Sequence, residues 1–186
     1  MNPSLTALEI RSARMTDWPQ LRKAVRTIFD HMDDAQISFL LRRHHAATVV
    51  AWRGREIVGY YQFYPHADPG VAWLNHFGVM PDHKGHGEAD ALLAFFLRHA
   101  KTCGFDSVAL DAVEGNVRAH RFYERNGFAR RSKQAHVDGV KWRFVMSLAG
   151  AVVLDQAMPS IQPPNTLTRA WRKLAFGMLT ARSFMR

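Results

Sequence analysis

The sequence predicts an α+β fold in which helices lie on both faces of a mixed, mostly antiparallel central sheet. Two observations lead to this fold class. Segments with strand-like and helix-like periodicity follow one another in the order strand, two helices, three strands, helix, strand, helix, two strands. Within this order, one strand–helix–strand unit predicts a parallel crossover, and the hairpins that flank it predict antiparallel pairs.

The chain begins with a strand and two helices. Residues 8–17 alternate apolar and polar side chains as a strand does. Residues 33–45 place acids first and bases last, the order that a helix dipole favours. The helix between these two segments is predicted from apolar side chains at a spacing near four: Leu21, Val25 and Phe29.

Three strands follow. Residues 47–65 form two β-branched and aromatic runs around Arg53-Gly54-Arg55, which predicts a hairpin. Residues 70–81 predict a third strand that ends at Pro81.

The C-terminal half alternates helices and strands. Apolar residues from Leu92 to Ala100 predict a helix that ends at Gly104. The remaining elements are a short buried strand, a helix ended by Gly127 and two last strands, expected at residues 106–113, 116–128, 128–134 and 140–148.

The turn before the first of these helices, Lys84-Gly85-His86-Gly87, is basic and rich in glycine. Free backbone N–H groups and the positive end of a helix dipole favour an anion at such a place. The two glycines would let the backbone approach a phosphate, and Lys84 and His86 add donors. A tight turn without a ligand is the alternative for a bare Gly-x-Gly. The pattern is neither a P-loop nor a dinucleotide fingerprint, because it lacks Gly-Lys-Ser/Thr and has Asp90 in place of the third glycine.

Length and composition restrict the class of protein. The 186 residues suit one domain with a short appendage, and 47% hydrophobic content suffices for a core. One cysteine excludes an internal disulfide, and neither a signal-like segment nor an apolar run of about 18 residues is found, so we expect a cytoplasmic protein. The net charge of +9 attracts anions: a phosphorylated cofactor, an acidic substrate, nucleic acid or an anionic lipid surface.

Two segments follow recognisable patterns. The segment from Val79 to Leu93 is similar to V-x-P-x-x-R/Q-G-x-G-x-A/G-x-x-L-L, and the segment from Asn116 to Phe128 is similar to Asn-x-x-Ala-x-x-Phe-Tyr-x-x-x-Gly-Phe. With these two patterns, residues 8–148 resemble the GNAT superfamily of acyl-CoA-dependent N-acyltransferases. The resemblance implies a GNAT-like acyltransferase domain at residues 1–148, followed by a C-terminal extension at residues 149–186.

The resemblance further implies that acetyl-CoA is the cofactor. Backbone amides of the turn would bind its pyrophosphate, a role carried over to Lys84, Gly85, His86, Gly87, Glu88 and Ala89. The strands on either side of the helix are expected to splay apart, so that the pantetheine arm enters along the backbone of Phe77 and Val79. Asn116 would hydrogen-bond the cofactor or cap its own helix, and the two roles are compatible.

Two of these positions depart from the family pattern. Lys84 replaces the usual arginine or glutamine, which keeps a cation at the phosphate without a bidentate fork. Glu88 replaces an apolar residue, and a carboxylate beside a pyrophosphate is repulsive unless it turns to solvent or pairs with Lys84. We expect a solvent-facing Glu88, and the alternative is a weakened affinity for the cofactor.

Attack of a neutral amine on a thioester needs a group that removes a proton and a group that protonates the departing thiolate. The resemblance places the Tyr123 hydroxyl at the coenzyme sulfur, and a phenol with a pKa of about 10 is a credible donor to a thiolate whose conjugate acid has a pKa of about 8.5. Packing in the core is the alternative role of Tyr123.

The resemblance also implies that a general base, or a water bound to it, lies on the strand before the turn. His76 is the candidate, because imidazole titrates near neutrality, and packing within the sheet is the alternative. The other polar residues expected near the cleft are Asn75, Asp111 and Glu114, of which only the last two could be bases. Asp82, His83 and His86 do not complete a set of metal ligands, so we expect no metal.

The C-terminal extension begins with a linker, PSIQPP, and continues with a basic, partly amphipathic helical pattern. Its apolar stripe is made of Leu167, Trp171, Leu174, Met178 and Met185. Such a stripe is expected to dock on its own domain or on a second copy as a homodimer, and contact with an anionic membrane is the alternative.

These observations predict an enzyme that moves an acetyl or other short acyl group from acyl-CoA to a primary amine of a small molecule or peptide, with no nucleic-acid partner. The alternative is a scaffold protein that keeps the fold, binds coenzyme A without turnover and uses its basic surface to contact nucleic acid or membrane. Residues 17–46, expected to line the acceptor pocket, carry no recognisable substrate motif.

Overall fold

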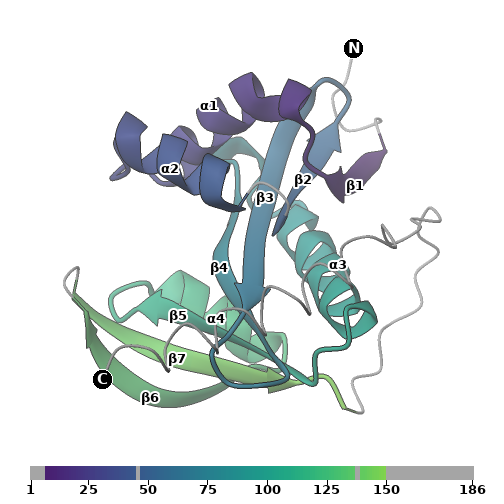
Figure 1. Cartoon of the computed structure of the whole chain (residues 1–186). Coiled ribbons are helices and arrows are strands. Elements are labelled where there is room, and N and C mark those ends of the chain that lie inside the picture. Colours follow the sequence, from purple (N-terminus) through teal and green to yellow (C-terminus); the bar gives the residue numbers. More distant parts are fainter. Residues whose placement is uncertain (1–6, 45–46, 137–138, 150–186) are drawn as a thin grey trace, which may run out of the picture. The chain divides into compact units, whose positions relative to one another are not determined.

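The computed structural model describes residues 7–44, 47–136 and 139–149, and Figure 1 labels their elements. The C-terminal extension lies outside the described residues apart from its first position. The strands are β1 (Leu8–Ser12), β2 (Thr48–Arg53), β3 (Glu56–Pro65), β4 (Val71–Val79), β5 (Ser107–Val113), β6 (Ala129–His136) and β7 (Gly139–Ser147). The helices are α1 (Trp18–Ile28), α2 (Asp34–His44), α3 (Glu88–Thr102) and α4 (Val117–Arg125), with short 3-10 turns at Met15–Asp17 and Pro81–His83.

The predicted order of strands and helices is confirmed, with one difference at the first strand. The alternating pattern of residues 8–17 is a strand only as far as Ser12. A 3-10 turn follows because the buried Asp17 carboxylate accepts hydrogen bonds from the Arg11 guanidinium (2.7 and 3.0 Å) and from the Arg14 backbone N–H (2.7 Å).

The seven strands form a mixed sheet in the order β1-β2-β3-β4-β5-β7-β6. The pairs β1–β2, β2–β3, β5–β7 and β6–β7 are antiparallel. The pair β4–β5, which α3 connects, is parallel. The predicted mixed, mostly antiparallel sheet with a central crossover is therefore confirmed.

The chain divides into two compact units, and the first comprises Met1–Tyr64 and Leu74–Phe96. One face of its strands packs on α1 and α2, in a core that contains Leu21, Val25, Ile37, Leu41, Val50 and Tyr60. On the opposite side of β3, the rings of Tyr61 and Phe63 contact Phe96 of α3 at 5.1 and 5.5 Å between centroids. Helices thus cover both faces of β3, as predicted.

The second unit comprises Pro65–Trp73 and Leu97–Arg186. Its central strand, β5, is buried at Val108, Ala109 and Leu110, as its apolar run predicts. Helix α4 packs on β7, because the rings of His120 and Tyr123 contact Phe144 at 5.4 and 5.8 Å. Across the described part of both units, no helix is long and apolar enough to cross a membrane.

Candidate active site

The turn expected to bind phosphate joins β4 to α3 in the first unit. Gly85 and Gly87 have φ angles of +92° and +90°, values that residues with side chains rarely adopt. A Cβ atom at either position would meet no other atom within 4 Å. The backbone conformation, and not close packing, therefore requires glycine here, and Lys84 and His86 beside it are exposed.

The backbone of this turn fits the pyrophosphate of coenzyme A. Within the described residues, the N–H groups of Gly85, His86 and Gly87 donate no backbone hydrogen bond. The Ala91 N–H donates to the Gly87 carbonyl at 3.0 Å, so the helical hydrogen bonds of α3 begin there. Amides without backbone acceptors at a helix N-terminus, two glycines, and the exposed side chains of Lys84 and His86 as further donors are features that favour an anionic group.

Glu88 does not face solvent, so the expectation for this residue is wrong. Its side chain is 2% exposed, and its Oε1 accepts hydrogen bonds from Nε and Nη2 of Arg53 at 3.1 and 2.9 Å. His83 Nδ1 lies 3.7 Å from the same oxygen. The cation that compensates Glu88 is therefore Arg53, at the end of β2, and not Lys84.

The environment of Glu88 keeps it ionised. Burial favours the neutral carboxyl, but hydrogen bonds from the residue's own backbone N–H and from Arg53 outweigh burial, so the pKa of Glu88 lies below its ordinary value. The Glu88 N–H thus has its own carboxylate as a competing acceptor. Lys84 is a second such residue among the six expected to bind pyrophosphate, because its N–H donates to the Pro81 carbonyl at 3.2 Å.

His76 lies on β4 and is half-buried, as is its neighbour Asn75. Its Nδ1 atom lies 3.3 Å from the Tyr60 hydroxyl. Its ring meets Phe29 edge-on at 5.0 Å and stacks on Tyr60 at 6.4 Å between centroids. The packing role left open for His76 is therefore present, together with a polar contact that the sequence did not predict.

Tyr123 lies on α4 in the second unit and is 8% exposed. Its ring packs against Phe122, Phe128 and Phe144 at 5.3, 5.5 and 5.8 Å. Burial raises the pKa of Tyr123 above its ordinary value, so the hydroxyl stays protonated at neutral pH. The core-packing role is thus present, and it is compatible with a role as hydrogen-bond donor.

Asn116 caps α4, since its Oδ1 accepts the Ala119 N–H at 3.0 Å. The predicted N-cap role is confirmed, and contact with the cofactor stays a prediction. Of the other residues expected for coenzyme A, Val79 is buried, whereas Phe77 and Ala89 are half-buried.

The two other candidate bases are engaged in ion pairs. Asp111 binds Arg143 through both oxygens, at 2.5 and 3.2 Å. Glu114 pairs with Lys133, whose hydrogen bond lowers the pKa of this carboxyl. Each of these two carboxylates thus has a cationic side chain as its partner.

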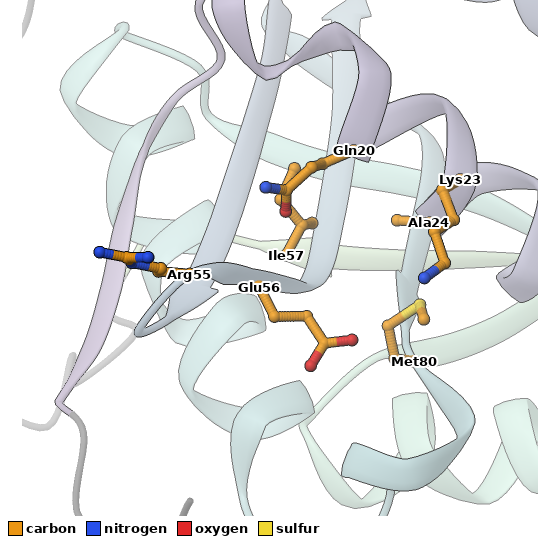
Figure 2. Close-up of a pocket in the computed structure, with 7 residues that line it drawn as sticks. All are labelled: Gln20, Lys23, Ala24, Arg55, Glu56, Ile57 and Met80. Carbon is orange, nitrogen blue, oxygen red and sulfur yellow. The ribbon is translucent and has the colours of Figure 1, made fainter.

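A pocket of about 280 Å³ lies in the first unit, and its lining contains none of the predicted site residues. Figure 2 shows the residues that line it, which are Gln20, Lys23, Ala24, Arg55, Glu56, Ile57 and Met80. Among residues 7–44, 47–136 and 139–149, no group of three or more His, Cys, Asp or Glu side chains could hold a metal ion.

Comparison with known proteins identifies a family that the sequence matches and solved structures that the fold resembles. The model of the Acetyltransferase (GNAT) family matches residues 7–128. "Probable N-acetyltransferase family 8 member 5" of Mus musculus is 29% identical over 134 residues, which are 70% of this chain and 58% of that protein. The chain thus spans little more than half the length of this relative.

The solved structures that share the fold include the following two. Ard1 from Thermoplasma volcanium has a TM-score of 0.66 and 21% identity, over 76% of this chain and 97% of its own. The PaiA N-acetyltransferase of Thermoplasma acidophilum, solved in complex with coenzyme A, has a TM-score of 0.61 and 15% identity, over 76% and 99%.

Proposed function

Since the chain belongs to the Acetyltransferase (GNAT) family, whose members use acetyl-CoA, we propose that it transfers an acetyl or another short acyl group from acyl-CoA to a primary amine of a small molecule or peptide. The observation that carries this proposal is the turn before α3. There Gly85 and Gly87 adopt positive φ angles, and the amides of residues 85–87 have no backbone acceptor in the part of the chain that the structure describes. The net charge of +9 favours the same anionic cofactor.

Residues of the two segments that resemble the family, Val79 to Leu93 and Asn116 to Phe128, would hold the cofactor. Within the turn from Lys84 to Ala89, the amides of Gly85, His86, Gly87 and Ala89 would bind the pyrophosphate. The side chains of Lys84 and His86 would add hydrogen-bond donors. The pantetheine arm would follow the backbone of Phe77 and Val79. The parallel pairing of β4 with β5 supports this path, because it comprises only the three residue pairs from Val71–Ser107 to Trp73–Ala109. When bound, acetyl-CoA supplies an activated thioester.

Tyr123 would act on the departing thiolate as a hydrogen-bond donor. A thiol has a pKa of about 8.5 and a free phenol about 10, and burial raises the pKa of Tyr123 further. Complete transfer of the Tyr123 proton to the sulfur is therefore uphill. A hydrogen bond that strengthens as negative charge develops on sulfur stabilises the transition state without that transfer.

The subcellular localisation and the partners are proposed from the sequence alone. The single cysteine suits the reducing cytoplasm. The apolar stripe of the C-terminal extension suits docking on its own domain or on a second copy.

The experiment is a panel of amines incubated with acetyl-CoA, with free thiol as the readout. Thiol release that depends on one class of amine, together with acetylated product by mass, would support the proposal. Tight binding of coenzyme A without thiol release on any amine would favour the scaffold protein instead.

A further inference from the structure

The rings of Phe29 and Tyr60, both in the first unit, contact the ring of His76. Phe29 follows α1, Tyr60 lies on β3 and His76 lies on β4. Tyr60 is 0% exposed, whereas His76 is half-buried. Phe29 contacts both other rings edge-on, at 5.0 Å to His76 and 6.1 Å to Tyr60. The imidazole is therefore held by ring packing and by the contact with the Tyr60 hydroxyl.

The hydrogen bond between Tyr60 and His76 can be formed in two ways. A neutral imidazole has one N–H and one acceptor nitrogen. Either the Tyr60 O–H donates to Nδ1, and the proton of His76 is on Nε2, or the Nδ1–H donates to the Tyr60 oxygen, and Nε2 is the acceptor. Only the second form leaves Nε2 able to take a proton from an amine.

The burial of Tyr60 decides between the two forms. Among the described residues, the Tyr60 hydroxyl has no hydrogen-bond partner except His76. Burial raises the pKa of Tyr60 well above its ordinary value, so the hydroxyl keeps its proton. If Nδ1–H were the donor, the hydroxyl hydrogen would be buried without an acceptor, which disfavours that tautomer by roughly tenfold or more.

We infer that Tyr60 is a positioning residue that donates to Nδ1 of His76 and holds the neutral ring in its Nε2–H tautomer, so that His76 serves the reaction as a hydrogen-bond donor. The part of this inference that concerns the reaction rests on the proposed function. The part that concerns the tautomer rests on the structure alone. The Nε2–H group would donate to the acceptor molecule or to the carbonyl oxygen as it gains charge. The amine proton would then pass to water. This role competes with the role of general base expected from the sequence.

The tautomer is tested by ¹⁵N NMR of the full-length protein labelled at histidine. In a neutral ring the nitrogen without a proton resonates far downfield of the N–H nitrogen. The signals of His76 are identified by their absence in His76→Gln. We expect Nδ1 to be the unprotonated nitrogen, and we expect Tyr60→Phe to shift both nitrogens toward a mixture of tautomers.

Tyr61→Phe is the matched control, because Tyr61 is equally buried and its ring packs on Phe96, on the other side of β3. It should leave the His76 signals in place. A protonated Nδ1 in the unmodified protein, or equal effects of Tyr60→Phe and Tyr61→Phe, would overturn the inference.

Turnover measurements on variants of His76 distinguish a hydrogen-bond donor from a general base. Glutamine can donate from its amide but cannot act as a base, whereas leucine can do neither. If His76 is a donor, His76→Leu should lower turnover by about 10² and His76→Gln should retain at least tenfold more activity than His76→Leu. Equal losses in both variants would indicate a base and refute the donor role. If no amine is acetylated, the proposed function fails, while the NMR experiment still decides the tautomer.

Discussion

The ion pair between Arg53 and Glu88 connects the end of β2 to the first residue of α3, and Arg53→Met tests what it contributes to stability. Methionine keeps much of the length of the side chain but leaves the Glu88 carboxylate, 2% exposed, without its cation. Breaking a buried pair in this way costs about 3–5 kcal/mol. In a chain of this size 1 kcal/mol lowers Tm by about 2–4 °C, so we expect Tm to fall by about 6–20 °C in a thermal melt.

The pH dependence of the melt identifies the cause. In the unmodified protein the pKa of Glu88 lies below its ordinary value, so its stabilising contribution is present above about pH 4.3 and is lost as the pH falls through the lowered pKa. In Arg53→Met, burial should instead raise the pKa of Glu88. The folded state then resists ionisation, so the difference in Tm between variant and parent should widen as the pH rises from about 4 to 7.

Arg55→Met is the control for this prediction. Arg55 belongs to the same turn, but its side chain is exposed. Its replacement should change the free energy of unfolding by no more than about 0.5 kcal/mol. Two variants with equal melting curves, or a difference in Tm that is independent of pH, would refute the reasoning.

Three further predictions concern the cofactor, Tyr123 and the C-terminal extension. Coenzyme A at 100 times its Kd should stabilise the protein by about 2.7 kcal/mol, pantetheine should do much less, and a melt that responds to NAD but not to coenzyme A would contradict the assignment of the turn. Tyr123→Phe should leave the Kd of coenzyme A within a few-fold and lower turnover by about 10- to 1,000-fold, whereas equal turnover would leave Tyr123 with a packing role only. If a second copy covers the apolar stripe of the C-terminal extension, truncation after Ala149 should convert a dimer to a monomer on a sizing column and preserve coenzyme A binding. Loss of the amine reaction with an unchanged oligomeric state would place the extension over the acceptor pocket instead.

The helices and strands could be predicted because each depends on neighbouring residues. Leu21 and Val25 are four positions apart and meet on one face of α1, so the spacing alone identifies a buried helix face. The hairpin around Gly54 is equally local, since its φ of 62° requires a residue that tolerates a positive value. The turn at Gly85 and Gly87 likewise depends on neighbouring residues that tolerate positive φ angles. Its family pattern could therefore be recognised without a structure.

The partners of the site residues could not be predicted, because they depend on register and on segments far apart in the chain. Arg53 and Glu88 are 35 positions apart, and no spacing in the sequence indicates that a hairpin turn approaches the start of α3. Tyr60 and His76 meet across β3 and β4, where a shift of register by one residue would turn either side chain to the other face. A basic turn followed by an unexpected acid near a helix start is the only signal that could have indicated the first pair.

The sequence motif that identifies Tyr123 does not predict the pKa of its hydroxyl, because that pKa depends on the rings that surround it. Three phenylalanine contacts exclude water from the ring, so ionisation of the hydroxyl is disfavoured and its pKa rises. The same burial makes a retained hydrogen bond stronger, because the local dielectric is lower than in water. A group that keeps its proton but donates strongly stabilises the thiolate more than the thioester. Its loss should therefore appear in turnover and leave the affinity for coenzyme A nearly unchanged.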